Sequence, residues 1–250
     1  MPSDNDNCVL VERRDHITIV TINRPHVRNA VNRPTAEKLT RAFRDFEADT
    51  DVEIFVPVQV YLKALIDPSI ASLANSISYD PNDDGPMGPT RMTLRKPVIA
   101  AISGYAVAGG LELACWCDLR VADATAVLGV FCRLRGRSAA MDLLLTGRSV
   151  TAQEAHSLRL VNELAKPTET ALTAALRLAT MLSLHPQLCM RSDRQSLYEV
   201  DSDQEAMRHE FEVGIEVLRS QEFRGRVISF LAKEGRHGSG LKPVIMKSNL

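Results

Sequence analysis

The sequence predicts an α/β fold with a helical C-terminal region, and two observations carry this prediction. Short apolar segments alternate with helical patterns over about the first two-thirds of the 250 residues, and the last third has helical patterns only. From Lys96 to Asp123, an apolar run, a turn of small residues, a helical run and a second apolar run follow in order, as in a βαβ-like unit. We therefore expect a core over 1–185 and a helical region over 186–250 that ends in a loose polar tail.

The N-terminal strands and helix are predicted from alternating β-branched residues, from apolar spacing and from the positions of prolines. Two β-branched stretches, Val9 to Val11 and His16 to Ile22, predict two strands around a turn. The apolar spacing from Thr35 to Ala48 predicts a helix, which a preceding proline opens. The stretch Val52 to Val60 predicts a strand interrupted by Pro57, which favours a sheet edge or a bend because proline has no N–H.

The remaining elements follow from similar signals. Thr151 and Glu154 have the spacing of a capping box, which predicts a helix start. The further predicted strands are 98–102, 119–122, 124–132 and 161–164. The further predicted helices are 61–66, 69–79, 111–117, 138–145, 151–160, 169–184, 186–197, 204–220 and 222–231.

Composition excludes several classes of protein. The formal net charge is −1 and no basic stripe occurs, so nothing indicates nucleic-acid binding. No run approaches the roughly 20 apolar residues of a membrane-spanning helix. The first eight residues are acidic and polar, unlike a targeting signal, which favours a cytoplasmic location. The five cysteines are scattered, as expected for free thiols in a reducing compartment, and no metal site is predicted.

The small-residue turn from Ser103 to Gly110 (the glycine turn) is open to several interpretations. A dinucleotide fingerprint needs three glycines at fixed spacing after the first strand, and a phosphate loop needs Gly-Lys-Ser/Thr. Neither pattern is present. An oxyanion hole needs only free backbone N–H groups at a helix start, which this turn can supply. The structural alternative is close strand–helix packing through small residues.

Glu112 is the one acidic residue inside the apolar helical run that follows the turn. It lies two residues after Gly110, so we expect its carboxylate in the first turn of a largely buried helix, beside free N–H groups. A carboxylate in that position is unusual, which indicates a functional role.

The central stretch KPVIAAISGYAVAGGLELACWCDLRVAD resembles the signature of the enoyl-CoA hydratase/isomerase (crotonase) family. NRPHVRNAV near the N-terminus, LLLTGRSVTAQEA and LVNEL are similar to other parts of that family. EFEVGIEVLRSQEFRGRVISFLAKEGRHG has the spacing of its closing helices. The resemblance covers nearly the whole chain in order. It implies a crotonase-like spiral of ββα units over 1–185 and a helical oligomerisation region over 186–250, in a homotrimer or hexamer.

The resemblance also implies a ligand and a site. The ligand is an acyl-CoA thioester, with coenzyme A part of the substrate and no further cofactor or metal. Its carbonyl oxygen would be held by the N–H of Gly109, and Glu112 would activate water. Substrate-binding positions by the same resemblance are Gly110 and Ala108 in the turn, and Arg28 and Ala30 in the loop that lines the CoA channel.

Four departures from the family pattern indicate a divergent member, a decaying member or an incomplete gene model. The loop expected to supply the second oxyanion N–H, Val56 to Tyr61, has no glycine and contains a proline. Cys132 stands at the position of the second glutamate, and the segment Cys132 to Ser138 is shortened. Arg159 stands where the family prefers glycine, which is strained if that position is left-handed.

Two functions remain open from the sequence. The first is an enzyme of fatty acid metabolism that hydrates, dehydrates or isomerises an acyl-CoA through an enolate, with Glu112 as base. The second is a catalytically impaired protein of the same fold that retains CoA-ester binding or only oligomer structure. The intact Gly109 to Glu112 segment favours the first, and the altered donor loop with Cys132 favours the second.

Overall fold

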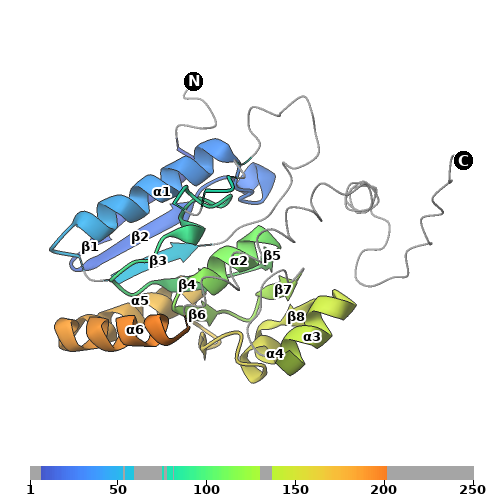
Figure 1. Ribbon diagram of the computed structural model, residues 1–250. Helices are drawn as coiled ribbons and strands as arrows, with labels where there is room; N and C mark the ends of the chain where they lie inside the picture. The colour runs from blue at the N-terminus through green and yellow to red at the C-terminus, as the bar shows by residue number, and fades with distance from the viewer. Residues whose placement is uncertain are drawn as a thin grey trace, which may run out of the picture. The chain divides into compact units, whose positions relative to one another are not determined.

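The computed structural model describes residues 7–52, 54–58, 75, 78–80, 82–129 and 137–201. The chain divides into two compact units, 1–195 and 196–250, and every described strand belongs to the first unit. Its strands are β1 (Val9–Arg14), β2 (Ile17–Ile22), β3 (Ile54–Val58), β4 (Ile99–Ile102), β5 (Tyr105–Val107), β6 (Leu119–Ala122), β7 (Val127–Gly129), β8 (Val150–Thr151) and β9 (Glu163–Leu164). Its helices are η1 (Pro25–Val27), α1 (Arg33–Ala48), η3 (Pro89–Arg91), α2 (Gly109–Trp116), α3 (Arg137–Thr146), α4 (Ala152–Ser157), α5 (Ala171–Ser183) and α6 (Gln187–Asp201), the last of which runs on into the second unit (Figure 1).

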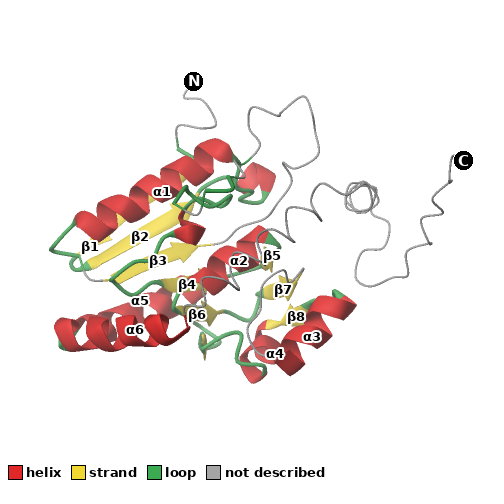
Figure 2. Cartoon of the chain, viewed as in Figure 1, coloured by secondary structure: helices red, strands yellow, loops and turns green. Residues whose placement is uncertain are grey.

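Strands form one large and one small sheet (Figure 2). The large sheet has the order β1-β2-β3-β4-β6-β9, and all neighbours are parallel except the β1–β2 hairpin. The small sheet has the order β5-β7-β8. In the units β4-β5-α2 and β6-β7-α3, the first strand joins the large sheet and the second joins the small one. This repetition is the ββα spiral that the sequence resemblance implied, and the mixed α/β class is confirmed.

The two faces of the large sheet bury different helices. Along β2, Val20 and Ile22 pack in the cluster that contains Leu39 and Phe43 of α1. Ile17 and Ile19 point to the opposite face and pack with the alanines of α5. This division follows from the period of two in a strand, and it places β2 and β4 between two helical layers.

Helix α1 begins at Arg33, two residues before the predicted start at Thr35, and ends at Ala48 as predicted. The side chain of Asn32 caps it by accepting a hydrogen bond from the Thr35 amide at 3.2 Å, and a proline occupies its first turn. The Thr151 hydroxyl caps α4 in the same way, accepting from the Glu154 amide. The Glu154 carboxylate, however, binds Arg148 at 2.6 Å, which corrects the reciprocal bond of the expected capping box.

The expectation for Pro57 was wrong in one respect. β3 lies inside the large sheet between β2 and β4, and not at an edge. Its pairing is uneven, because all five residues pair with β2 whereas only Val58 pairs with β4, at Ala101. The lack of a proline N–H is tolerated where the ladder with one neighbour is this short.

Some sequence predictions fall outside the described residues. These are the helices over 61–66, 204–220 and 222–231, and most of the one over 69–79. None of the helices in the described part of the chain is long and apolar enough to cross a membrane.

Candidate active site

Three segments predicted to form the site begin at the carboxyl ends of neighbouring strands in the large sheet. Parallel pairing aligns Thr21, Val58, Ala101 and Val121 in one row across β2, β3, β4 and β6. The chain therefore leaves β2, β3 and β4 at the same level. Ligand sites of α/β sheets lie outside the carboxyl ends of such strands. The loop that follows β2, the segment after β3 and the glycine turn after β4 all begin here.

Helix α2 starts at the end of the glycine turn with unpaired donors. Ala108 is its N-cap residue, and the first intrahelical bond runs from the Glu112 amide to the Ala108 carbonyl at 3.0 Å. The amides of Gly109, Gly110 and Leu111 have no acceptor among the described residues. Free N–H groups and the positive end of the helix dipole together favour an anionic oxygen at this point.

Glu112 lies in the first turn of α2, next to these donors. Glu112 is partly exposed, whereas the helix around it is largely buried, as the sequence predicted. No ion pair or hydrogen bond to its carboxylate is found in the described ranges. Arg120, a basic residue on the following strand, binds backbone carbonyls instead. A carboxylate left without a structural partner is available for proton transfer.

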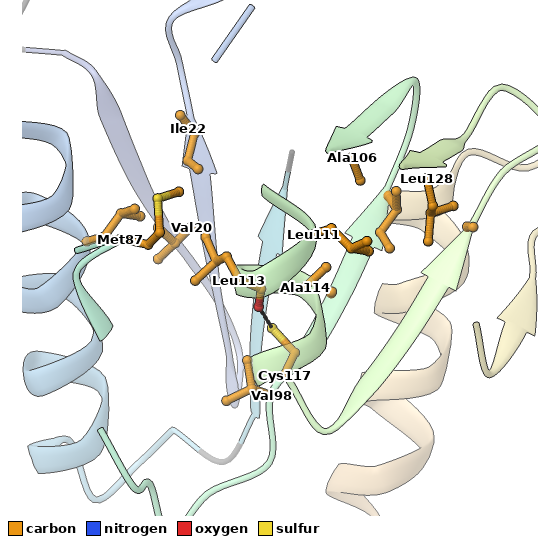
Figure 3. Close-up of a cluster of buried hydrophobic side chains, with 14 of the residues drawn as sticks. Val20, Ile22, Met87, Val98, Ala106, Leu111, Leu113, Ala114, Cys117 and Leu128 are labelled. Atoms are coloured by element: carbon orange, nitrogen blue, oxygen red, sulfur yellow. Dashed lines mark hydrogen bonds between the residues drawn. The ribbon is translucent and has the colours of Figure 1, made fainter. Parts of the chain in front are cut away.

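Packing on both sides fixes the direction of α2 (Figure 3). Leu111 points toward Ala106 and Leu128 of the small sheet, and Leu113 points toward Val20 of the large sheet. All five side chains are buried in one cluster. Helix α2 is therefore wedged between the sheets, and its N-terminus is held where the glycine turn ends.

The far end of α2 is fixed by two side chains. The Trp116 indole N–H donates to the Met92 carbonyl at 3.0 Å, and its ring packs edge-on against Phe43. Arg120 donates to the Cys117 carbonyl through Nη1 and to the Leu160 carbonyl through Nε, both at 2.7 Å. A guanidinium at this end complements the negative end of the helix dipole.

A carboxylate network holds the beginning of the glycine turn. Asp123 follows β6 and accepts hydrogen bonds from the Ser103 and Thr125 hydroxyls. The Gly104 amide in turn donates to the Thr125 hydroxyl at 3.0 Å. Partial burial opposes ionisation of Asp123, but the bonds from Ser103 and Thr125 outweigh it, so the pKa of Asp123 is lowered. Sequence reasoning missed this network, since only the parallel pairing of β4 with β6 brings its members together.

Hydrogen bonds within the loop after β2 fix its backbone conformation. The Arg24 amide donates to the Asn29 side chain at 2.7 Å, and the Asn29 amide returns a bond to the Arg24 carbonyl at 2.8 Å. Ala30 is buried, whereas Arg28 is exposed in a left-handed conformation. This loop and the glycine turn begin at the same end of the large sheet, after β2 and β4.

The predicted second donor loop is largely outside the described residues. Val56, Pro57 and Val58 lie within β3, which corrects their assignment to the loop, and the residues from Gln59 on are not described. Cys132 also falls outside the described ranges. Arg159 does adopt a left-handed conformation with φ of 63°, the condition under which strain was expected.

Metal ligation finds no support in the described part of the chain. No group of three or more His, Cys, Asp or Glu side chains there could hold an ion. Cys115 and Cys117 lie on or after α2, and burial raises the pKa of both thiols. Burial keeps them protonated, the form that is a poor metal ligand.

This fold defines a class of protein, a ββα spiral in which a helix start presents backbone N–H groups beside a glutamate, and comparison with known proteins agrees on the fold. Residues 90–134 match the family model described as enoyl-CoA hydratase/isomerase. An enoyl-CoA hydratase of Mycobacterium tuberculosis is 32% identical over 90% of this chain and 93% of its own length. The 2,3-dehydroadipyl-CoA hydratase of Escherichia coli is 28% identical over 96% of both chains.

Solved structures show the same relationship. A carnitinyl-CoA hydratase from Mycobacterium avium superimposes with a TM-score of 0.78 at 26% identity, covering 91% of this chain and 96% of its own. An enoyl-CoA hydratase from Mycobacterium tuberculosis does so with a TM-score of 0.69 at 30% identity, covering 92% and 97%. The chain belongs to the enoyl-CoA hydratase/isomerase family and has the crotonase fold.

Proposed function

We propose that this protein is an enzyme that hydrates, dehydrates or isomerises an acyl-CoA thioester, with Glu112 as its general base. The observation that carries the proposal is the partly exposed Glu112 carboxylate in the first turn of α2. It has no described partner and lies beside the free amides of Gly109 and Gly110. Coenzyme A enters as part of the substrate, and the chemistry needs no other cofactor.

The roles follow from charge development. When a nucleophile adds to an enoyl thioester, or when a proton leaves the carbon next to the carbonyl, negative charge moves onto the thioester oxygen. The Gly109 amide, at the positive end of α2, stabilises that oxygen. Gly110 and Ala108 shape the same turn, and Arg28 and Ala30 are our candidates for the CoA side of the site.

Glu112 then moves the proton. In hydration it accepts a proton from the attacking water, and in its protonated form it returns a proton to the enolate carbon. In isomerisation it removes a proton from one carbon and returns it to another. A single carboxylate is sufficient for either route, so cysteine at position 132 does not exclude activity.

The test is turnover of crotonyl-CoA and longer enoyl-CoAs, followed by chromatography of the CoA products. A 3-hydroxyacyl product indicates hydration and a displaced double bond indicates isomerisation. We expect Glu112→Gln to lower kcat by about 10²–10⁴-fold. The matched control is Glu154→Gln, which changes the first-turn glutamate of α4 and should leave kcat unchanged. Wild-type protein without turnover, or with activity equal to that of Glu112→Gln, contradicts the proposal.

A second function, binding of CoA esters without turnover, rests on the absence of any glycine from Val56 to Tyr61. Loss of one oxyanion donor lowers the rate by about 10²–10³-fold. Calorimetry with butyryl-CoA distinguishes the two, because binding without turnover of any enoyl-CoA supports the second function.

Assembly and location are part of the same proposal. We infer a homotrimer or hexamer formed through the region 186–250, in the cytoplasm. Light scattering of the purified chain tests the first inference, because a monomeric mass contradicts it. Microscopy of a fluorescently tagged chain in its own cell tests the second.

A further inference from the structure

Ala108 has a backbone conformation that favours glycine. Its φ is 49° and its ψ is −127°, close to the first central residue of a type II′ turn. In this region a Cβ atom is close to backbone atoms, and non-glycine residues are strained there. Strain of this kind persists only where surrounding contacts impose it.

Two hydrogen bonds impose it here. The Ala108 amide donates to the Gly129 carbonyl at 3.2 Å and so extends the pairing of β5 with β7 by one residue. The Ala108 carbonyl accepts from the Glu112 amide at 3.0 Å, the first bond of α2. The first bond fixes the peptide plane before Ala108, and the second fixes the peptide plane between Ala108 and Gly109 and with it the direction of the Gly109 N–H.

A relaxed alternative lies one peptide flip away. Turning the Ala108–Gly109 peptide by about 180° takes ψ of Ala108 from −127° to about 53° while φ stays at 49°. These angles lie in the left-handed helical region, which alanine tolerates better. Gly109 absorbs the accompanying change of its own φ because it has no side chain. The flip breaks the bond to Glu112 and turns the Gly109 N–H away from the site.

Building on the proposed function, we propose that Ala108 is a positioning residue whose strain limits the fraction of molecules in which the Gly109 N–H faces the thioester oxygen. The strain favours the flipped peptide and the bond to Glu112 opposes it, and the two effects are of the same order. Active and flipped orientations therefore coexist. Glycine at position 108 removes the strain from the active orientation and increases its population.

The experiment compares wild type with Ala108→Gly and a matched control, Arg159→Gly. Arg159 is an exposed, left-handed residue after α4 and is not part of the site. Both variants should raise Tm by about 2–4 °C. Only Ala108→Gly should raise kcat on crotonyl-CoA, by about threefold to tenfold, with KM nearly unchanged. We expect kcat to change more than KM because the Gly109 N–H acts mainly on the charge that develops in the transition state.

A second readout does not depend on turnover. The infrared stretch of the carbonyl in bound, isotope-labelled butyryl-CoA reports donation from Gly109, and it should move to lower frequency in Ala108→Gly than in wild type. If neither wild type nor Glu112→Gln turns over, the proposed function fails and this shift alone decides the role of Ala108.

A higher Tm with unchanged kcat and carbonyl frequency overturns the role of Ala108 but not the proposed function. An equal gain of kcat in Arg159→Gly also overturns it, and failure of both proteins to bind butyryl-CoA overturns both proposals.

Discussion

The Ser103 hydroxyl donates a hydrogen bond to the Asp123 carboxylate, which joins the residues that follow two neighbouring strands. β4 ends at Ile102 and β6 at Ala122, and these two residues are partners in the sheet. The bond therefore links the carboxyl ends of β4 and β6 at the point where the glycine turn begins. Since the turn leads directly into α2, this contact is one of those that set where the free amides lie.

We first predict that Asp123→Asn destabilises the protein at neutral pH. The amide cannot accept hydrogen bonds with the strength of a carboxylate, so the free energy of unfolding should fall by about 1–2 kcal/mol. Urea denaturation measures this change. The control is Asp84→Asn, which removes an exposed ion pair with Arg44 and should cost less than about 1 kcal/mol. Equal losses in the two variants would contradict the role of the Ser103–Asp123 contact.

The contribution of Asp123 should also depend on pH in a defined direction. Its pKa is lowered in the folded state, so the folded protein binds this proton more weakly than the unfolded chain does. The stabilisation is therefore complete above the unfolded pKa of about 4 and disappears as the pH falls through the lower folded value. The difference in unfolding free energy between wild type and Asp123→Asn should shrink below about pH 4. A difference that grows on acidification would show that the sign is wrong.

Arg194 of α6 should matter more for stability than Arg148, although each binds a carboxylate. Arg194 donates to Asp118 at 2.8 Å and to the Leu94 carbonyl at 2.5 Å, with its side chain 16% exposed. Arg148 bridges Asp142 and Glu154, but its side chain is 38% exposed. We expect Arg194→Ala to cost about 2–3 kcal/mol, because it removes the guanidinium from a partly buried ion pair with Asp118, and Arg148→Ala less than about 1 kcal/mol. Urea denaturation of both variants provides the comparison, and the reverse order would contradict it.

Arg120 should stabilise the C-terminal end of α2 by its shape as well as its charge. Its two nitrogens reach the carbonyls of Cys117 and Leu160 at once, which lysine cannot do. We expect Arg120→Ala to lower the unfolding free energy by about 2 kcal/mol and Arg120→Lys to recover less than half of that. Hydrogen exchange of the α2 amides should accelerate in the same order. Full recovery by lysine would mean that the charge alone matters.

Sequence patterns predicted most of the elements that hold the site. The β-branched run of β2, the apolar stripe of α1 and the small-residue passage from β4 into α2 are local signals, and the structure has each element within a few residues of its predicted bounds. β5 was not predicted, since three residues inside a turn carry no periodicity and pair only because β7 lies beside them. The edge position predicted from Pro57 was wrong for a related reason. A proline in the sequence does not reveal how many residues of its strand pair with each neighbouring strand.

The site shows the same division. Glu112 and the glycines that precede it could be singled out because a carboxylate in an apolar helix start is rare in sequence. The strain at Ala108 could not, since one of the two hydrogen bonds that impose its φ and ψ goes to Gly129, which lies on another element. The support from Asp123 and Arg120 is likewise invisible in sequence, because each reaches residues that only the parallel sheet brings near.

The thiols of Cys117 and Cys189 should react at very different rates. Cys117 is buried and its Sγ donates to the Leu113 carbonyl at 3.3 Å, whereas Cys189 is exposed on α6. Burial strongly raises the pKa of Cys117, so its reactive thiolate is scarce as well as inaccessible. Iodoacetamide treatment of the native protein at pH 8, followed by peptide mass mapping, should show modification of Cys189 and none of Cys117. After unfolding in urea both should react at similar rates. Native modification of Cys117 as fast as that of Cys189 would mean that the end of α2 opens to solvent, and that packing does not hold this helix in place.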